Sequence, residues 1–363
     1  MKEKRNYGID LLRVLSMLYV VILHTLKQGG ILDNAVPGSG QYQIAWLLES
    51  WCLCAVNIFG MISGYVGYTE EEKPHRVSGW LMMWLQVVFY GVTATAFFAV
   101  AKPGLVQPGH FLKMFFPVST DLYWYFTAYT ALFLLIPLLN SAVRHCGKPN
   151  LRILFVALIL VFSVFDSFAD VMRLARGYSF GWLMILYLLG AIIKKCGIGS
   201  KLTAPAAAGG IVLSCLLCWL WKLGGVTFDL YMFRAEPELI AAYPFPFHVL
   251  SAICHVLLFS RLRFGDGTRK AISFMASGAF AVYLLNTQRF VWSEVMENTF
   301  VHLASRHPAV LTIRVVLFAA GFVAVALLLD GVRRKLFAVL RIKQRLMGLE
   351  DKLTGKESLV KTR

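Results

Sequence analysis

Residues 9–24 read IDLLRVLSMLYVVILH, an almost wholly apolar stretch that contains Arg13 and His24. The stretch is long enough to enter a bilayer as a helix. At about 100° and 1.5 Å per residue, the separation of eleven residues puts both side chains on one helix face, about 16 Å apart. A cation inside a membrane helix costs roughly 2.5–3.5 kcal/mol, so it persists mainly where it faces a protein interior or a water-filled cavity. The pair therefore predicts a polar path between the two membrane faces.

The composition is that of a membrane protein. Of the 363 residues, 58% are hydrophobic and only 15% are charged, whereas a soluble protein has about 25% charged residues. Apolar runs of about 17–25 residues indicate membrane helices. The sequence predicts an all-α, polytopic membrane protein with about ten transmembrane helices. The runs span residues 9–27, 44–66, 80–101, 122–143, 151–167, 180–196, 205–222, 243–260, 271–292 and 309–330.

The basic residues predict the orientation. Most lysines and arginines fall in alternate loops and in the C-terminal segment, as the positive-inside rule requires, so the net charge of +16 does not indicate nucleic-acid binding. Both termini are expected in the cytoplasm. Residues 1–331 are expected to form one ten-helix membrane domain and residues 332–363 a basic tail. The tail pattern fits an amphipathic helix on the anionic inner leaflet, and equally an extension of the last membrane helix.

Three polar residues of the first two helices are catalytic candidates. His24 as a neutral imidazole can accept a proton near pH 7, which suits a general base, although a membrane histidine often serves only in packing. Glu49 should lie at a depth near His24 and could orient the imidazole, or it could sit in the wet interface. Asn57 lies deeper in the second helix and could orient the imidazole instead.

Three basic residues are candidates for binding an anionic cosubstrate. Arg13 could hold an anion beneath His24, or it could simply pair with Asp10 three residues earlier. Lys73 and Arg76 lie in the first cytoplasmic loop and could bind the phosphates of a cytoplasmic cofactor. The positive-inside rule alone would also explain why Lys73 and Arg76 lie in this loop.

Two polar or aromatic clusters are candidates for substrate binding. Trp124, Tyr125 and Tyr129 open the helix at residues 122–143, where aromatic side chains form an interfacial belt or stack on sugar rings. Asn286 and Gln288 lie near the outer end of the helix at residues 271–292 and could face His24 across a cavity. No group of His, Cys and carboxylate residues has metal-ligand spacing, so no metal is expected.

Five segments in order resemble the integral-membrane acyltransferase family 3. They are the first-helix stretch with its arginine and histidine, VNIFGMISGY, YWYFTAYTALFLLIPLLN, AYPFPFHVLSAICHVLLF and ISFMASGAFAVYLLN. The chain most resembles the branch of ten-helix bacterial O-acyltransferases that act on cell-surface polysaccharides.

The resemblance implies acyl transfer from cytoplasmic acyl-CoA, expected to be acetyl-CoA, to a hydroxyl of a cell-surface or lipid-linked carbohydrate in the bacterial plasma membrane. Acyl-CoA would be a co-substrate, with no tightly bound cofactor. Arg13 and His24 would inherit the essential roles, and Lys73 and Arg76 would contact the donor. The chain departs from the family pattern twice: Lys73 stands where arginine is common, and Asn286 where many relatives have histidine. Direct transfer and a histidine-bound acyl intermediate both remain open.

A transporter or flippase for a small polar or lipid-linked substrate is the alternative function. Polar residues inside apolar helices suit both classes. Transporters often contain inverted repeats, and the sequence contains no recognisable internal repeat. A membrane sensing domain is a third class, with no soluble effector module to support it.

Overall fold

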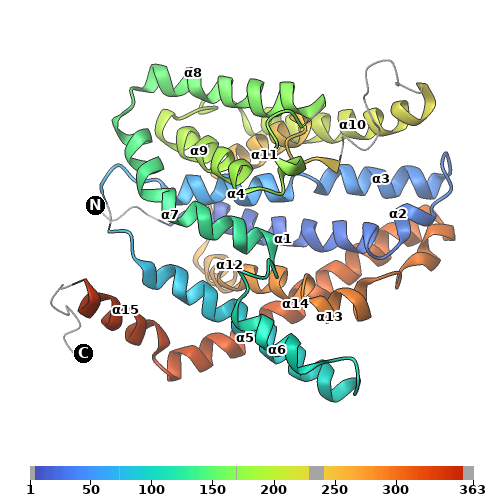
Figure 1. Cartoon of the computed structure of the whole chain (residues 1–363). Coiled ribbons are helices and arrows are strands. Elements are labelled where there is room, and N and C mark those ends of the chain that lie inside the picture. The colour runs from blue at the N-terminus through green and yellow to red at the C-terminus, as the bar shows by residue number, and fades with distance from the viewer. Residues whose placement is uncertain (1–4, 73, 169, 229–240, 355–363) are drawn as a thin grey trace.

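The computed structural model describes residues 5–72, 74–168, 170–228 and 241–354, and these form helices joined by short loops (Figure 1). The helices in chain order are α1 (Tyr7–Lys27), α2 (Ile31–Asn34), α3 (Gly40–Cys52), α4 (Ala55–Gly67), α5 (Val77–Ala101), α6 (Pro108–Phe115), α7 (Trp124–His145), α8 (Lys148–Ile159), α9 (Phe180–Cys196), α10 (Ala204–Phe228), α11 (Pro246–Phe259), α12 (Asp266–Asn286), α13 (Arg289–Val291), α14 (Pro308–Val339) and α15 (Ile342–Leu353).

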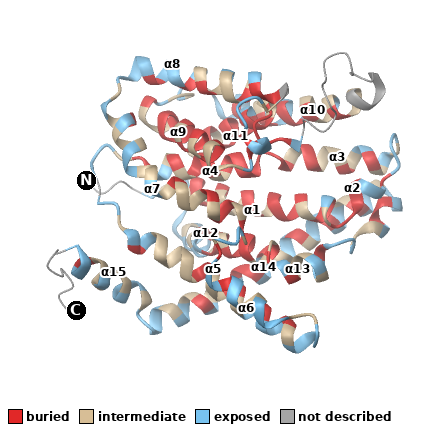
Figure 2. Cartoon of the chain, viewed as in Figure 1, coloured by how far each residue is buried: buried red, intermediate tan, exposed pale blue. Residues whose placement is uncertain are grey.

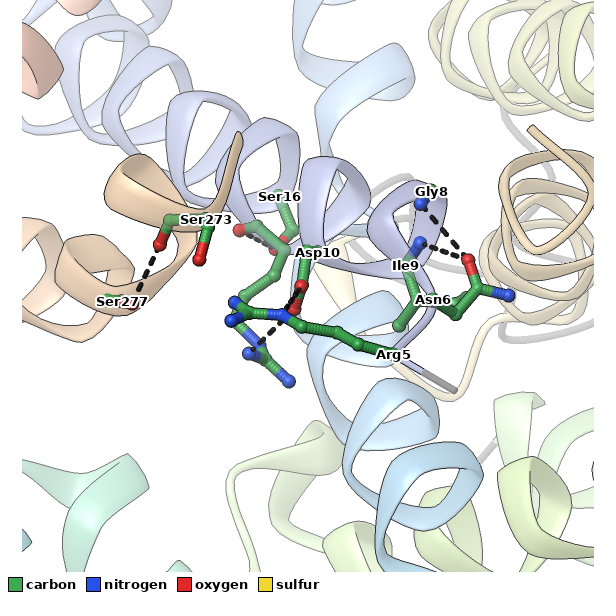
Figure 3. A network of polar contacts seen from close by, with 9 residues as sticks. Arg5, Asn6, Gly8, Ile9, Asp10, Ser16, Ser273 and Ser277 are labelled. Carbon is green, nitrogen blue, oxygen red and sulfur yellow. Dashed lines mark hydrogen bonds and ion pairs between the residues drawn. The ribbon is translucent and has the colours of Figure 1, made fainter. Parts of the chain in front are cut away.

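Helix α1 runs through the middle of the bundle (Figure 1). It packs against α3, α4 and α11 on one side and against α12 and α14 on the other. The side chain of Asn6 starts the helix, because its Oδ1 accepts hydrogen bonds from the backbone N–H groups of Gly8 and Ile9 (Figure 3). The predicted polar face of α1 therefore lies inside the protein.

Helices α4 and α9 touch at their backbones. A Cβ atom added to Gly64 would lie 1.8 Å from the carbonyl oxygen of Tyr187, and one added to Gly190 would lie 2.0 Å from that of Met61. Glycine permits this approach because it has no side chain, and small residues are typical where membrane helices meet closely. The contact fixes the wall of the bundle beside α1.

The loops predicted to be cytoplasmic gather at one end of the bundle, here called the α15 end. Lys194 Nζ donates to the carbonyl oxygen of Tyr68 (2.8 Å) after α4, and Lys195 Nζ to that of Val143 (2.7 Å) near the end of α7. Asn6 Nδ2, before α1, donates to the carbonyl oxygen of Ser260 (2.7 Å) after α11. At the opposite α2 end, residues 298–300 bond to residues 28–29.

The predicted fold class is confirmed: the described residues form an all-α, polytopic membrane protein. Within the described ranges, seven helical segments are long and apolar enough to cross a membrane. The count of about ten is not confirmed by this measure, because the helices α9 and α11, of 17 and 14 residues, are shorter and α12 is less apolar. Buried residues concentrate on α1, α4, α9 and α11, whereas α8 exposes apolar side chains such as Ile153, as expected for a lipid-facing helix (Figure 2).

The tail consists of an extension of α14 and a separate helix, α15. Helix α14 continues through the expected domain boundary at residue 331 and ends at Val339. The chain then turns at Arg341, whose φ of +50° is left-handed, and α15 follows as a separate helix packed against α5. The tail therefore reaches back to the bundle.

Candidate active site

The imidazole of His24 is held by two neighbours near the end of α1. Its Nδ1 hydrogen-bonds with Oδ1 of Asn286, the last residue of α12. The side-chain nitrogen of Asn286 faces the sulfur of Met296 at 3.8 Å, so the amide oxygen points to His24, and this oxygen can only accept. In the neutral imidazole this arrangement favours the tautomer with its hydrogen on Nδ1 and its lone pair on Nε2. Trp292 packs edge-on against the imidazole, with ring centroids 4.8 Å apart.

Three cavities follow one another along α1. The first, here called the Glu49 cavity, has a volume of about 600 Å³, and His24 and Glu49 both line it at the α2 end. The middle cavity, of about 40 Å³, is also lined by His24. It shares Tyr125 and Phe280 with the third, the Arg13 cavity, of about 240 Å³. Consecutive cavities share lining residues, so they form a row of adjacent cavities, here called the path, from Arg13 past His24 to the α2 end.

Arg13 lines its cavity together with Ser63 and Tyr129. Its Nη1 lies 3.4 Å from Oδ1 of Asp10, whereas Nε of Arg5 lies 2.5 Å from Oδ2 of the same carboxylate. Figure 3 shows Arg5 reaching across to Asp10. Arg13 therefore forms the ion pair with Asp10 that their spacing allowed, but the contact is long. One long contact uses one of the five guanidinium donors, and the others have no hydrogen-bond partner among the described residues.

Asn57 is fully buried and occupied by the fold. Its Nδ2 donates to the carbonyl oxygen of Tyr243 at 2.7 Å, and its Oδ1 accepts from Nε1 of Trp182 at 2.9 Å. These bonds join α4 to α9 and to the segment before α11. The sequence suggested Asn57 or Glu49 as the partner of the imidazole, and the structure gives that position to Asn286 instead.

Glu49 lines the Glu49 cavity and is 7% exposed. Its Oε2 is buried without a hydrogen-bond partner among the described residues. It shares the cavity with His24 but does not hydrogen-bond to it. The carboxylate is therefore placed near the imidazole without orienting it.

Arg76 lies at the α15 end, directly before α5. Its Nη1 lies 3.3 Å from Oδ1 of Asp351 in α15, and the neighbouring Glu350 accepts hydrogen bonds from the backbone N–H groups of Val77 (2.8 Å) and Ser78 (3.3 Å). Helix α15 thus packs over the position that the family resemblance assigns to the donor. Lys73, the other basic residue of that assignment, lies outside the described residues.

Some of the predicted substrate-binding residues line the cavities, whereas others support the fold or hold His24. Trp124 and Tyr125 line the middle cavity, and Tyr125 and Tyr129 line the Arg13 cavity. Asn286 holds His24 rather than a ligand. The Oε1 of Gln288 accepts from the backbone of the next helix, α13, at 2.8 and 3.1 Å, so Gln288 caps that helix.

A family model described as an acyltransferase domain matches residues 6–330. The chain belongs to acyltransferase family 3. The protein is thus a membrane acyltransferase. No curated protein and no solved structure matches the chain.

Sequence reasoning missed several residues that line the cavities of this acyltransferase. Trp292 contacts the imidazole, and Tyr243 lines both the middle cavity and the Glu49 cavity. Trp46 and Lys222 line the Glu49 cavity from α3 and α10, with Nζ of Lys222 4.1 Å from the ring centroid of Trp46. Only Tyr243 carried a signal, since it lies in the AYPFPF segment that resembles the family.

Proposed function

We propose that this acyltransferase moves a small acyl group, acetyl in the first place, from cytoplasmic acyl-CoA to a hydroxyl group of a cell-surface or lipid-linked carbohydrate. The α15 end would face the cytoplasm and the α2 end the outside of a bacterial plasma membrane. This orientation agrees with the positive-inside bias of the sequence. The donor would then enter the Arg13 cavity and the acceptor the Glu49 cavity.

One observation carries the proposal: His24 lines both the Glu49 cavity and the middle cavity, and its hydrogen bond to Asn286 is made through Nδ1, which leaves Nε2 as the candidate base. In the proposed reaction, Nε2 takes the proton of the acceptor hydroxyl as its oxygen attacks the thioester carbonyl. The C–S bond then breaks, and the imidazolium returns the proton to the CoA thiolate. An ester and free CoA are the products. The bond to Asn286 keeps Nδ1 protonated throughout, so that Nε2 is the working base.

The path favours a small acyl group. A cavity needs about 10–15 Å³ to hold one water molecule. The middle cavity, of about 40 Å³, therefore suits an acetyl group better than a long acyl chain. Arg13 would hold the polar part of the thioester arm. Arg76 would contact a phosphate of CoA after leaving Asp351, because a guanidinium binds phosphate through two donors.

The acceptor side supports a sugar. The Glu49 cavity, of about 600 Å³, falls in the size range of small-molecule sites. Tyr42, Trp46 and Trp292 supply aromatic faces, and Glu49 supplies a hydrogen-bond acceptor. Faces of this kind stack on sugar rings, and carboxylates bind sugar hydroxyls.

The test is acyl transfer by the purified protein in lipid nanodiscs, with radiolabelled acetyl-CoA and a panel of methyl glycosides. We expect sugar-dependent release of CoA and a labelled ester. The variant His24→Gln should lose at least about 100-fold in rate while keeping its thermal stability, because a general base contributes about 10²–10⁴. Wild-type rates in His24→Gln would exclude the role of His24.

Two further measurements separate the remaining alternatives. Protein quenched in acid after exposure to acetyl-CoA alone should carry no covalent label, and a labelled His24 would instead establish an acyl relay. Proteoliposomes that move acetyl-CoA or a lipid-linked sugar across the membrane without forming an ester would support the transporter reading and overturn the proposal.

A further inference from the structure

Tyr283 and Asn286, the residue that holds His24, share one face of α12, because they are three residues apart. The side chain of Tyr283 is buried and lines the middle cavity together with His24. This cavity would hold the acyl group in the proposed transfer. One helix therefore carries both the residue that orients the base and a phenol that lines the same cavity as the base.

The hydroxyl oxygen of Tyr283 accepts a hydrogen bond from the backbone N–H of Tyr125 at 3.3 Å. Tyr125 lies in the first turn of α7, where backbone N–H groups have no acceptor within their own helix. The positive end of α7 thus faces the phenol oxygen and makes the phenol a stronger donor. The hydroxyl of Thr287 also lies near the phenol, but it donates to the backbone carbonyl oxygen of Tyr283 at 2.8 Å.

Two other tyrosines line the middle cavity, and their hydroxyl groups have other neighbours. The hydroxyl of Tyr243 donates to that of Tyr178 at 3.0 Å. The hydroxyl of Tyr125 lies beside that of Ser63, and both residues line the Arg13 cavity. Among the described residues, no hydrogen bond takes up the hydrogen of the Tyr283 phenol, so this hydrogen can turn to a ligand in the middle cavity.

The proposed reaction needs such a donor. When a hydroxyl attacks a thioester, the carbonyl oxygen becomes an oxyanion, and enzymes stabilise this charge with hydrogen-bond donors placed in advance. His24 cannot fill this place as well, because its Nε2 takes the proton of the attacking hydroxyl.

We propose that the phenol of Tyr283 donates a hydrogen bond to the carbonyl oxygen of the acyl group and stabilises the oxyanion of the tetrahedral intermediate. The phenol keeps its proton throughout, and the oxyanion becomes the ester carbonyl when the C–S bond breaks. This assignment rests on the proposed acyl transfer, and it holds for any acceptor hydroxyl. Tyr283 is then a catalytic residue, whereas Asn286 is a positioning residue.

The experiment compares Tyr283→Phe with the matched control Tyr123→Phe. Tyr123 is also buried, its ring centroid lies 6.0 Å from that of Tyr283, and its hydroxyl has no hydrogen-bond partner among the described residues. A third protein carries 3-fluorotyrosine at position 283, which keeps the phenol. The kcat, the KM of each substrate and the melting temperature are measured with acetyl-CoA and a sugar that the wild type acylates.

We expect Tyr283→Phe to lower kcat about 100-fold, as the loss of one oxyanion donor does. Both KM values should stay within about threefold, because the contact strengthens only as charge develops. Tyr123→Phe should change kcat by no more than about twofold, and 3-fluorotyrosine should retain at least about a third of it. A Tyr283→Phe protein that melts earlier but keeps its kcat per folded molecule would reduce Tyr283 to a support of α7 and overturn the proposal.

Two unreactive analogues of acetyl-CoA test the contact without turnover. In the first, a CH₂ group replaces the thioester sulfur, which leaves a ketone. In the second, CF₃ also replaces CH₃, so that the ketone adds water and resembles the tetrahedral intermediate. Tyr283→Phe should raise the Ki of the fluorinated analogue about 10- to 100-fold and that of the plain ketone by no more than about threefold. Equal changes for both analogues would exclude the contact with the oxyanion.

Failure of this inference and failure of the proposed function give different results. A wild-type protein that acylates no sugar would refute the proposed function. An active wild type with an unchanged kcat in Tyr283→Phe would refute only the role of Tyr283. A covalent acetyl label on Tyr283 after quenching in acid would make this residue an acyl carrier, which also overturns the inference.

Discussion

The two ends of the path hold their polar side chains in different ways. Near the α2 end, the imidazole of His24 is fixed by a buried amide and an aromatic ring, both parts of the bundle. Toward the α15 end, Arg13 and Arg76 rest on carboxylates at 3.4 and 3.3 Å, contacts at the long edge of hydrogen bonding. The contacts of His24 hold the imidazole in one orientation. The carboxylate partners of Arg13 and Arg76, in contrast, can be replaced by another anion.

The difference matches the chemistry proposed for each end. A general base needs its orientation before substrate arrives, since rate depends on the alignment of the reacting atoms. A binding site for a polyanion needs cations whose present partners are weaker than the incoming phosphates. Four predictions test whether the fixed end and the exchangeable end behave differently.

The largest effect is expected from Asn286→Leu at the fixed end. Loss of the amide oxygen leaves Nδ1 without an acceptor and frees the imidazole to change tautomer, so kcat should fall about 100-fold while both KM values change little. Asn286→Asp keeps an acceptor oxygen and should retain most of the activity. The measurement is kcat at matched protein levels, and a leucine variant above a third of wild-type kcat would contradict a role in positioning.

Arg13→Ala should have the next largest effect, which is expected in the KM of the donor, acetyl-CoA. The KM of acetyl-CoA should rise about 10- to 30-fold, because a charge-assisted contact is lost. Arg13→Lys should also be impaired, since an ammonium lacks the planar fork. Asp10→Asn should be much milder, within about threefold. Equal, small effects of Arg13→Ala and Asp10→Asn on donor kinetics would reduce Arg13 to a surface ion pair.

A smaller effect, of opposite sign, is expected from Asp351→Asn. If Arg76 leaves Asp351 to bind the donor, the variant should lower the KM of acetyl-CoA by about two- to fivefold, in keeping with a partly exposed ion pair of about 0–1 kcal/mol. Lys352→Gln on the same helix, which does not contact Arg76, is the control. A raised KM in Asp351→Asn would mean that α15 positions Arg76 for the donor.

The smallest effect on activity is expected from Asn57→Ala, which sharpens the contrast between a residue fixed for chemistry and one fixed for the fold. The change leaves the Trp182 indole and the Tyr243 carbonyl unpaired, so stability should fall by about 1–3 kcal/mol. Thermal melting in detergent would show this loss. Turnover per folded molecule should stay within about twofold, and a hundredfold loss without a change in melting would return Asn57 to the catalytic group.

The features that depend on local periodicity, the helices and the shared face of Arg13 and His24, could be predicted from the sequence. The helical spacing of Arg13 and His24 predicted a shared face, and the structure lines consecutive cavities with both side chains. The apolar runs predicted the helices, although not where α3 gives way to α4 near Leu53. These features depend on neighbours within a few turns of the chain, which a sequence displays directly.

Contacts between distant segments were beyond that reasoning. Asn286 lies 262 residues from His24, and the sequence suggested only that the two could face each other across a cavity, not that they hydrogen-bond directly. Asn57 and Glu49 looked alike as polar residues in an apolar helix, and only the packing shows that Asn57 is satisfied whereas Oε2 of Glu49 has no partner among the described residues. Gln288 likewise became a helix cap because of where α12 ends.

The glycine contact between α4 and α9 has a consequence for how substrates enter. Two backbones in direct contact have no layer of side chains that can repack, so these helices cannot slide past each other without breaking the carbonyl contacts at Gly64 and Gly190. That half of the wall therefore acts as a rigid frame. Any widening of the middle cavity that keeps this backbone contact has to come from lining side chains or from other helices, such as α12 with Phe280.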